Sequence, residues 1–594
     1  MMWCRLFALI AFLLTTSLSA ADGPAPLPGT KRLTMTGDIA SQMVEGVDRF
    51  LLAETEKSIE RRGQHWNRDT SSVQKYNASI EPNRKRLAHI LGVRDERVPF
   101  DAPELLATTS QPALIGQGEA YSVFAVRWPA FGDVHGEGLL LVPAGARPVL
   151  ADVIAIPDAA QTPEMIAGLT EGIAPQSQFA RRLAESGCRV LVPTLIDRNV
   201  THRRLTNREF LYRSAFEMGR HPIGYELQKV LAGVDWFAKE AGDGDAKIGV
   251  IGYGEGGMLA LYAAALDTRI DAACVSGYFG SRQKMWQEPI DRNVFGRLEQ
   301  FGDAELAAMI APRALIVEVA AGPQFEVPPG TGGGPGKLVT PTPEEVRDEL
   351  VRAGAMLKGL HAESQLKMVV SGDGTASMGS ATALLRLLER FGDRATLAEP
   401  GKPPKHFRKD FDPAPRHRQQ MHELDRHTQW LLRESPHVRR EFFERLDTSS
   451  SEKFNETIEW YRDTFYDEII GRFDDKPLPP NVRTRQAYDE PKWTGYEVVM
   501  DVFPDVIAYG ILLLPKDIKP NERRPVVVCQ HGLEGRPQDV VSGDGRSYHD
   551  FAAKLAERGF VTFAPQNLYI FGDRFRTLQR KANPLGKTLF SIII

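Results

Sequence analysis

The chain has little cysteine, almost no net charge and only one long apolar run in its 594 residues. One of its four cysteines, Cys4, lies at the N-terminus, and Cys188, Cys274 and Cys529 lie in or beside apolar, strand-like runs. Three cysteines are too few, and odd in number, for a disulfide framework. We therefore expect buried free thiols rather than a catalytic cysteine.

Charge and composition narrow the class of protein further. The 73 basic and 77 acidic residues leave a net charge of −4, which gives no reason to expect a nucleic-acid partner. A chain that is 42% hydrophobic and 25% charged has the composition of an ordinary globular protein. Its length favours two domains.

The single apolar run lies at the N-terminus. Residues Leu6–Leu18 are apolar, a cation precedes them, and Ser19-Ala20-Ala21 supply the small residues of a cleavage site. The run is too short to span a membrane as a finished helix, so we expect a signal peptide at residues 1–21. The switch to ADGPAPLPG disfavours a buried N-terminal helix. The expected mature protein is secreted or periplasmic, with no membrane span.

An internal repeat organises the rest of the chain. GLLLVP at 138–143 recurs as GILLLP at 510–515, and FARRLAESGCRVLVP at 179–193 recurs as FAAKLAERGFVTFAP at 551–565, with the same offset in both cases. HWNRDT at 65–70 is echoed by EWYRDT at 459–464, with a longer offset. Three matches in the same order predict two copies of one α/β unit.

Each copy begins with polar sequence of helical period, at about 36–92 and 417–470, before strands alternate with helices. This alternation predicts a mostly parallel sheet with helices on both faces. The Pro-rich, basic stretch between the copies predicts a linker. The expected domains are a degenerate unit at 22–397, a linker at 398–416, and a second, truncated unit at 417–594.

The glycine-rich segment IGYGEGG, residues 251–257, follows a strand signal and precedes a helix signal. Gly252, Gly254 and Gly257 match the dinucleotide-binding pattern G-x-G-x-x-G. Gly252 to Gly256 also match G-x-S-x-G, the nucleophile turn of hydrolases, with Gly254 in place of the serine. Several strand signals precede this turn, and Asp271, the acid at the expected distance from it, stands at the start of the next strand. Both facts disfavour the dinucleotide alternative.

The segments around this turn resemble the α/β-hydrolase superfamily, specifically the acetyl xylan esterases and dienelactone hydrolases. The first copy contributes FGDAELAAMIAPRALIVEV at 301–319, and the second copy contributes RRPVVVCQHGLEG at 523–535. The resemblance implies ester hydrolysis through a serine acyl-enzyme, with a histidine base and an acid. It also implies a small ester or acetylated polysaccharide as substrate, and no cofactor, metal or nucleotide.

The first copy departs from that pattern at each catalytic position. Gly254 offers no nucleophile, and IPDAAQ at 156–161 lacks the His-Gly of the oxyanion turn. No histidine lies between the last expected strand, QLKMVV at 365–370, and His406. Glu318 holds a vestigial acid position. Glu255 is a conceivable substitute nucleophile or base, but a solvent-facing glutamate favoured by the helix dipole is the preferred interpretation.

The second copy keeps His531-Gly532, and the backbone N–H of Leu533 is the expected oxyanion donor; the alternative is a simple tight turn. The repeat offset places the counterpart of Gly254 beyond Ile594, so we expect a truncated second unit. The leading interpretation is an exported esterase-family protein without a complete triad. The alternative is a carbohydrate-binding or scaffolding pseudo-hydrolase without catalysis.

The other polar clusters favour ordinary structural roles, and the oligomeric state stays open. The histidines between the copies have spacings that gather on no helical face, so a solvated basic segment is favoured over a metal site. These histidines are His406, His417, His422, His427 and His437. Trp128 and Trp286 could stack on sugars, although core packing is favoured. Ser276 and Ser281 are expected to be turn serines.

Overall fold

The computed structural model describes residues 25–145, 149–202, 205–242, 244, 246–328, 336–408, 412–532 and 535–568. Contacts divide these residues into two units, one formed by residues 51–473 and the other by residues 25–50 together with 474–568. These boundaries differ from the expected ones. Residues 25–50 group with the second sheet, and residues 417–473 group with the first. None of the described helices is long and apolar enough to span a membrane.

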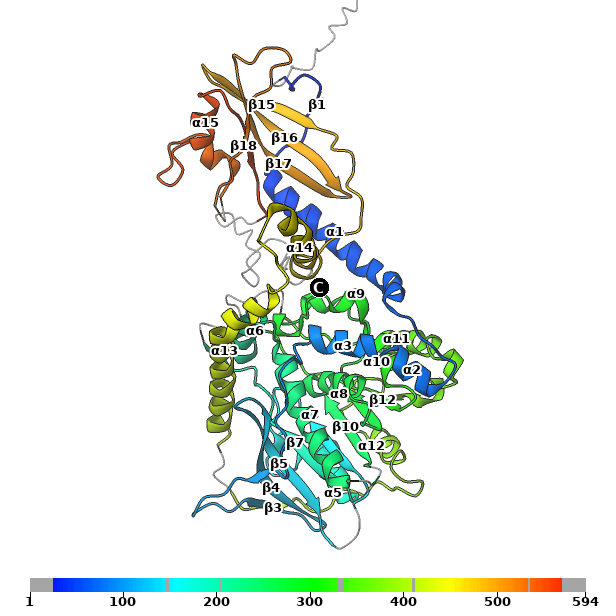
Figure 1. Cartoon of the computed structure of the whole chain (residues 1–594). Coiled ribbons are helices and arrows are strands. Elements are labelled where there is room, and N and C mark those ends of the chain that lie inside the picture. Colours follow the sequence, from blue (N-terminus) through cyan, green and yellow to red (C-terminus); the bar gives the residue numbers. More distant parts are fainter. Residues whose placement is uncertain are drawn as a thin grey trace, which may run out of the picture. The chain divides into compact units, whose positions relative to one another are not determined.

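The larger unit is built on one mixed sheet, whose strands run in the order β13-β12-β11-β10-β6-β7-β5-β4-β3-β14, with β2 paired to β4 (Figure 1). The strands are β2 Glu104–Leu105, β3 Leu114–Gln117, β4 Tyr121–Phe131, β5 Val134–Pro143, β6 Asp152–Ile156, β7 Arg189–Pro193, β10 Ile248–Tyr253, β11 Ala272–Ser276, β12 Ala314–Val319, β13 Leu366–Val370 and β14 Lys405–His406. Strands β6, β7 and β10 to β13 are parallel to one another. A short hairpin, β8 Val200–His202 and β9 Leu205–Thr206, forms a separate sheet.

Helices cover both faces of this sheet, as the alternation of strands and helices predicts. Helices α7, α8 and α10 contribute to one hydrophobic cluster with the lead-in helices α2 and α3, whereas α5 and α12 contribute to the other. The helices of the unit are α2 Val73–Ser79, α3 Glu81–Ile90, α4 Pro163–Ile166, α5 Phe179–Glu185, α6 Asn207–Glu217, α7 Pro222–Ala241, α8 Glu255–Leu266, α9 Arg297–Gln300, α10 Asp303–Ile310, α11 Pro343–Ala355, α12 Ala381–Leu388, α13 Ala414–Phe442 and α14 Ser451–Thr464. Strand β10 is buried throughout its six residues, which explains its uninterrupted apolar and glycine sequence.

Helix α13 packs against the rest of this unit through a row of polar side chains. Arg416 forms a two-bonded ion pair with Glu164, at 2.9 and 3.0 Å, and the Gln420 amide donates to the Thr194 carbonyl at 3.0 Å. The buried positions are Arg416, Gln420, Glu423, Leu424, His427 and Thr428. A spacing of three and four residues places them on one helical face. The prediction of a solvated basic segment is therefore wrong for this face. Residues of the expected linker also extend the sheet, as β14.

The smaller unit carries a six-stranded sheet in the order β1-β15-β16-β17-β19-β18. Its elements are β1 Lys31–Arg32, β15 Arg483–Asp489, β16 Trp493–Phe503, β17 Val506–Pro515, β18 Val526–Val528, β19 Val561–Pro565 and α15 Phe551–Ala556. Helix α1, Ile39–Arg61, contributes Ile39 and Met43 to a cluster with Val499 and Tyr509.

Strand registers in the two sheets follow the offset of the sequence repeat. Tyr121 pairs with Pro143 in the larger sheet, and Trp493 pairs with Pro515 in the smaller one. Gly138 pairs with Pro193, and Gly510 pairs with Pro565. Each residue and its counterpart in the second sheet are separated by the same number of residues along the chain. The register shift also falls at corresponding places, between Pro129 and Phe131 in one hairpin and between Asp501 and Phe503 in the other.

Candidate functional site

Gly254 lies at the sharp turn between β10 and α8, with φ 56° and ψ −112°. This backbone conformation is strained for any residue with a Cβ atom. The neighbouring glycines are required by close packing, because a Cβ at Gly252 would lie 2.0 Å from the Gly256 carbonyl oxygen. One at Gly256 would lie 2.2 Å from the Ile156 carbonyl oxygen. The turn thus has the geometry of a hydrolase nucleophile turn without its side chain.

Asp271 lies at the opposite end of β10 from this turn. Its carboxylate accepts a hydrogen bond from the backbone N–H of Ile248, the first residue of that strand, at 2.9 Å. An acid that binds the ribose of a dinucleotide belongs at the carboxyl end of a strand, beside the glycine turn. The position of Asp271 therefore speaks against the dinucleotide alternative.

The space in front of Gly254 is filled by the side chain of Asp158. A Cβ at Gly254 would lie 2.6 Å from Asp158 Oδ2 and 2.7 Å from Pro323 Cγ. Asp158 Oδ2 accepts a hydrogen bond from the Glu255 N–H at 3.0 Å, and Oδ1 accepts one from the Ala160 N–H at 2.9 Å. In hydrolases of this fold, the N–H after the nucleophile binds the oxyanion. Here that donor is bound to an internal carboxylate.

Arg198 balances the charge of this carboxylate. Its guanidinium donates to both oxygens of Asp158, at 2.5 and 3.2 Å. Burial raises the pKa of the Asp158 carboxyl, but Arg198 and the two backbone N–H groups outweigh burial and bring the pKa below its usual value. Asp158 is therefore ionised at neutral pH and places a negative charge against the N–H that follows Gly254.

Glu255 is fully buried, so the interpretation as a solvent-facing glutamate is wrong. Its carboxylate accepts hydrogen bonds from Arg198 at 3.0 Å, Arg208 at 2.7 Å and Arg292 at 2.8 Å. Burial raises the pKa of Glu255, but these three guanidiniums outweigh it and hold the pKa well below its ordinary value. A carboxylate bound by three cations is a weak base and a weak nucleophile. Its role in this structure is to neutralise buried arginines.

Glu318, at the end of β12, is buried and accepts four hydrogen bonds. The donors are Ser276 Oγ at 2.6 Å, Ser371 Oγ at 2.8 Å, and the N–H groups of Gly379 and Ser380, each at 2.8 Å. Three of these donors belong to the loop after β13, where the triad histidine is expected. Glu318 therefore holds this loop in place. Ser281, which follows β11, donates its hydroxyl hydrogen to the Gln283 side-chain oxygen.

In the smaller unit, His531 and Gly532 follow β18. His531 is buried, and its Nδ1 lies 2.7 Å from the Gly532 carbonyl oxygen. The Gly532 N–H donates to the Tyr548 hydroxyl at 2.8 Å. Leu533, the expected oxyanion donor, lies outside the described residues.

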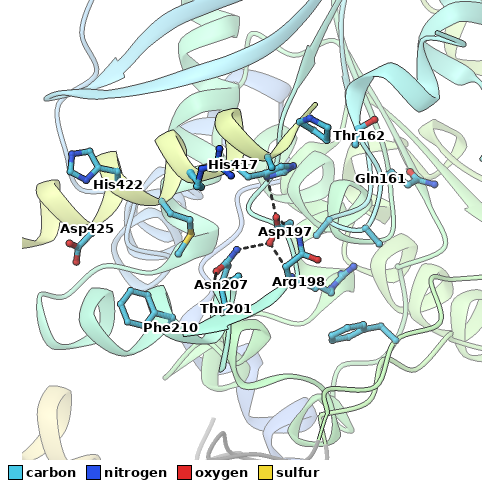
Figure 2. A pocket seen from close by; sticks show the side chains of 18 residues that line it. Gln161, Thr162, Asp197, Arg198, Thr201, Asn207, Phe210, His417, His422 and Asp425 are labelled. Carbon is cyan, nitrogen blue, oxygen red and sulfur yellow. Dashed lines mark hydrogen bonds and ion pairs between the residues drawn. The ribbon is translucent and has the colours of Figure 1, made fainter. Parts of the chain in front are cut away.

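A pocket of about 850 Å³ opens beside the filled turn, at the carboxyl ends of β6 and β7 (Figure 2). Its lining residues come from the loops after these strands, from α6, from the segment after β12, and from α13 and the residue before it. They are Ala159, Ala160, Gln161, Thr162, Asp197, Arg198, Asn199, Thr201, Asn207, Phe210, Phe325, Pro413, Ala414, His417, Arg418, Met421, His422 and Asp425. Asp197 and Arg198 lie in the loop after the buried strand β7, a position that could have identified them from the sequence. The place of His417 depends on the docking of α13. Among the described residues, no cluster of three or more histidine, cysteine, aspartate or glutamate side chains could hold a metal ion.

Trp128, one of the two tryptophans considered for sugar stacking, is in the core. It is buried, and its indole N–H donates to the Lys229 carbonyl at 3.0 Å. Trp286 lies in a short 3-10 helix at residues 285–287. Neither tryptophan lines the pocket.

Residues 151–294, which include β6, the glycine turn and the loops beside the pocket, match the model of the dienelactone hydrolase family. This segment belongs to the α/β-hydrolase superfamily. The α/β-hydrolase segment contributes both the filled turn and most of the pocket wall, whereas α13 lies outside it. No curated protein matches the chain.

Solved structures of esterases resemble the chain at low identity. A Bacteroides fragilis protein described as an acetyl xylan esterase is 15% identical, with a TM-score of 0.37 and coverage of 58% of this chain and 88% of its own. A glucuronoyl esterase from Solibacter usitatus is 14% identical, with a TM-score of 0.38 and coverage of 54% of this chain and 94% of its own. The superfamily assignment rests on the matched segment 151–294.

Proposed function

We propose that residues 51–473 form an α/β-hydrolase domain that binds an ester or an acetylated carbohydrate but has lost the serine acyl-enzyme route. The carrying observation is the ionised carboxylate of Asp158, which lies 2.6 Å from the point where a nucleophile's Cβ would stand. The same carboxylate takes the N–H of Glu255. A substrate oxyanion would have to displace this bound charge.

The lining of the pocket supports the ligand class. Gln161 carries a neutral amide of the kind that recognises hydroxyl and acyl oxygens, and Phe210 and Phe325 supply apolar faces. A dienelactone is a cyclic ester, so the family match of residues 151–294 supports the same chemistry. A pocket of about 850 Å³ has room for a ligand of several rings.

Two further features belong to the proposal. The strand registers share the offset of the sequence repeat, which supports an origin of the two sheets as tandem copies. The described residues include the glycine turn of the first copy only. The apolar run at 6–18 and its small-residue site support export to a secreted or periplasmic location.

Labelling and binding measurements on the full chain test the proposal. We expect no covalent labelling by a fluorophosphonate probe, and an increase in Tm when acetylated xylo-oligosaccharides are added. Phe210→Ala should weaken their binding about tenfold or more. Phe216→Ala is the matched control, because Phe216 lies on the same helix, is 52% exposed and does not line the pocket. Stoichiometric labelling, or equal binding by both variants, would contradict the proposal.

A further inference from the structure

Asp197 and His417 face each other in the wall of the pocket. Figure 2 shows the imidazole of His417 on α13 joined to the Asp197 carboxylate after β7, with Nδ1 and Oδ2 3.4 Å apart. Nδ1 is buried and has no hydrogen-bond partner among the described residues, so its contact with Asp197 is an electrostatic one. The ring lines the pocket, which leaves Nε2 as the nitrogen available to a ligand or water. This arrangement is an acid–histidine pair contributed by two elements that lie far apart in the chain.

Neighbouring groups hold Asp197 in one orientation. Its Oδ1 accepts hydrogen bonds from the Asn199 N–H at 3.0 Å and from the Asn207 amide at 2.7 Å, and its Oδ2 accepts one from the Asn199 amide at 2.8 Å. An acid that is fixed in this way can orient an imidazole and stabilise its protonated form.

The docking of α13 fixes the position of the histidine. Arg416, one residue before His417, binds the buried Glu164 with both terminal nitrogens, and Gln420, one turn later, binds the Thr194 carbonyl. His417 is only 16% exposed. The histidine is therefore held by buried contacts on both sides along the helix.

Burial lowers the pKa of His417, although the Asp197 carboxylate opposes the effect. Glu164 also raises the pKa, and the cations Arg416 and Lys229 lower it. The imidazole is consequently neutral at pH 7 and can accept a proton. Its environment thus suits a base.

We propose that Asp197 and His417 form a general-base pair that activates a water molecule for direct hydrolysis of an ester bound in this pocket. Nε2 takes a proton from water while the water oxygen forms a bond to the acyl carbon. The bond between that carbon and the alcohol oxygen then breaks, and the proton passes from Nε2 to the departing oxygen. Ester and water become acid and alcohol, with no acyl-enzyme and no serine. Arg198 and Gln161 line the same pocket.

This inference rests on the proposed ligand class, but it assigns chemistry to residues that are not part of the degenerate triad. His417 lies outside the matched segment 151–294, and neither Gly254 nor Glu318 takes part. The filled turn and the working base can therefore coexist in one domain.

The test compares variants of the full chain on 4-nitrophenyl acetate and on acetylated xylo-oligosaccharides. His417→Gln should lower turnover by about 100-fold or more, the usual scale for general-base catalysis. Asp197→Asn should also lower it and should shift the pH profile, because the imidazole loses its orienting carboxylate. His437→Gln is the control, since His437 is exposed on the same helix and roughly 30 Å along it from His417. Far-ultraviolet circular dichroism and Tm monitor folding.

The wild-type rate should rise with pH as the imidazole loses its proton, and no burst of 4-nitrophenol should precede steady turnover. Turnover by wild type no faster than by His417→Gln, with oligosaccharide binding intact, would overturn the pair and leave the proposed function standing. A stoichiometric burst would overturn direct water attack. Absence of oligosaccharide binding would contradict the proposed function, and hydrolysis of 4-nitrophenyl acetate would still decide the role of the pair. If His417→Gln does not fold, Asp197→Asn and the wild-type pH profile decide it.

Discussion

Restoring a serine at the elbow, by Gly254→Ser, should destabilise the larger unit without creating an esterase. The new Cβ would lie 2.6 Å from Asp158 Oδ2 and 2.7 Å from Pro323 Cγ, so its neighbours must move. Crowding of a packed interior costs about 1–3 kcal/mol. The backbone at φ 56° adds about 1–3 kcal/mol for a residue with a Cβ. The expected loss in the free energy of unfolding is thus about 2–6 kcal/mol.

Gly242 provides a control that separates these two contributions. It has nearly the same backbone conformation, φ 55° and ψ −124°, but no atom lies within 4 Å of the point where its Cβ would stand. Gly242→Ser should therefore cost only the backbone strain. Urea unfolding followed by circular dichroism measures both variants, and a fluorophosphonate probe reports any activated serine. Equal destabilisation by the two variants, or labelling of the Gly254→Ser protein, would refute the reasoning about the filled turn.

Three further perturbations test the buried charges. Glu255→Gln should lower the free energy of unfolding by about 3–5 kcal/mol at pH 7, because it removes the carboxylate that neutralises the buried arginines. The control is Glu459→Gln, an exposed position, which should change the free energy of unfolding by less than about 1 kcal/mol. Because folding lowers the pKa of Glu255, its contribution is present above the unfolded value near 4.5 and disappears as the pH falls, so urea titrations should show the two proteins converging in acid. Lys229→Met should raise the Tm at pH 7, because burial lowers the pKa of the Lys229 amine to about 8 and no described group hydrogen-bonds to it. The unfolded chain keeps this proton up to about pH 10.5, so wild-type stability should rise between pH 8 and 10.5 and the advantage of the variant should shrink. A lower Tm of the variant at pH 7 would count against this account. Burial raises the pKa of Glu423, but its hydrogen bonds and Arg127 bring the pKa to about 2. The protection factors of the α13 amides, taken relative to intrinsic exchange at the same pH, should therefore be lower in Glu423→Gln and should fall in wild type below pH 4.5. Unchanged protection factors would show that α13 is held elsewhere.

The strands of the two sheets could be predicted from local sequence. Apolar runs such as GLLLVP and GILLLP specify strands because each must bury its side chains against helices on a sheet face. The same offset reappears in the strand registers, since a one-residue slip would exchange the two faces. The glycine turn could also be predicted, because Gly252 and Gly256 leave no room for a Cβ.

The domain boundaries and the state of Glu255 could not be predicted in the same way. Residues 25–50 belong with the second sheet and α13 with the first, an arrangement set by contacts between segments that are distant in the sequence. From the sequence, Glu255 is a glutamate in the first turn of a helix, where the helix dipole favours a solvent-exposed carboxylate. Its partners Arg198, Arg208 and Arg292 come from separate loops and from α6, and their spacing along the chain contains no sign of convergence.

The sequence by itself determined that the glycine turn carries no serine at position 254 and that no histidine lies between residues 370 and 406, because the identity of a residue does not depend on folding. Only the tertiary structure decided what stands in their place. Asp158 fills the elbow because the loop after β6 passes directly in front of the turn after β10, its parallel neighbour. His417 meets Asp197 because α13 packs against β5 and α6, and its first turns reach the loop after β7. Both contacts join residues far apart in the chain, and only the packing of the sheet and its helices brings them together.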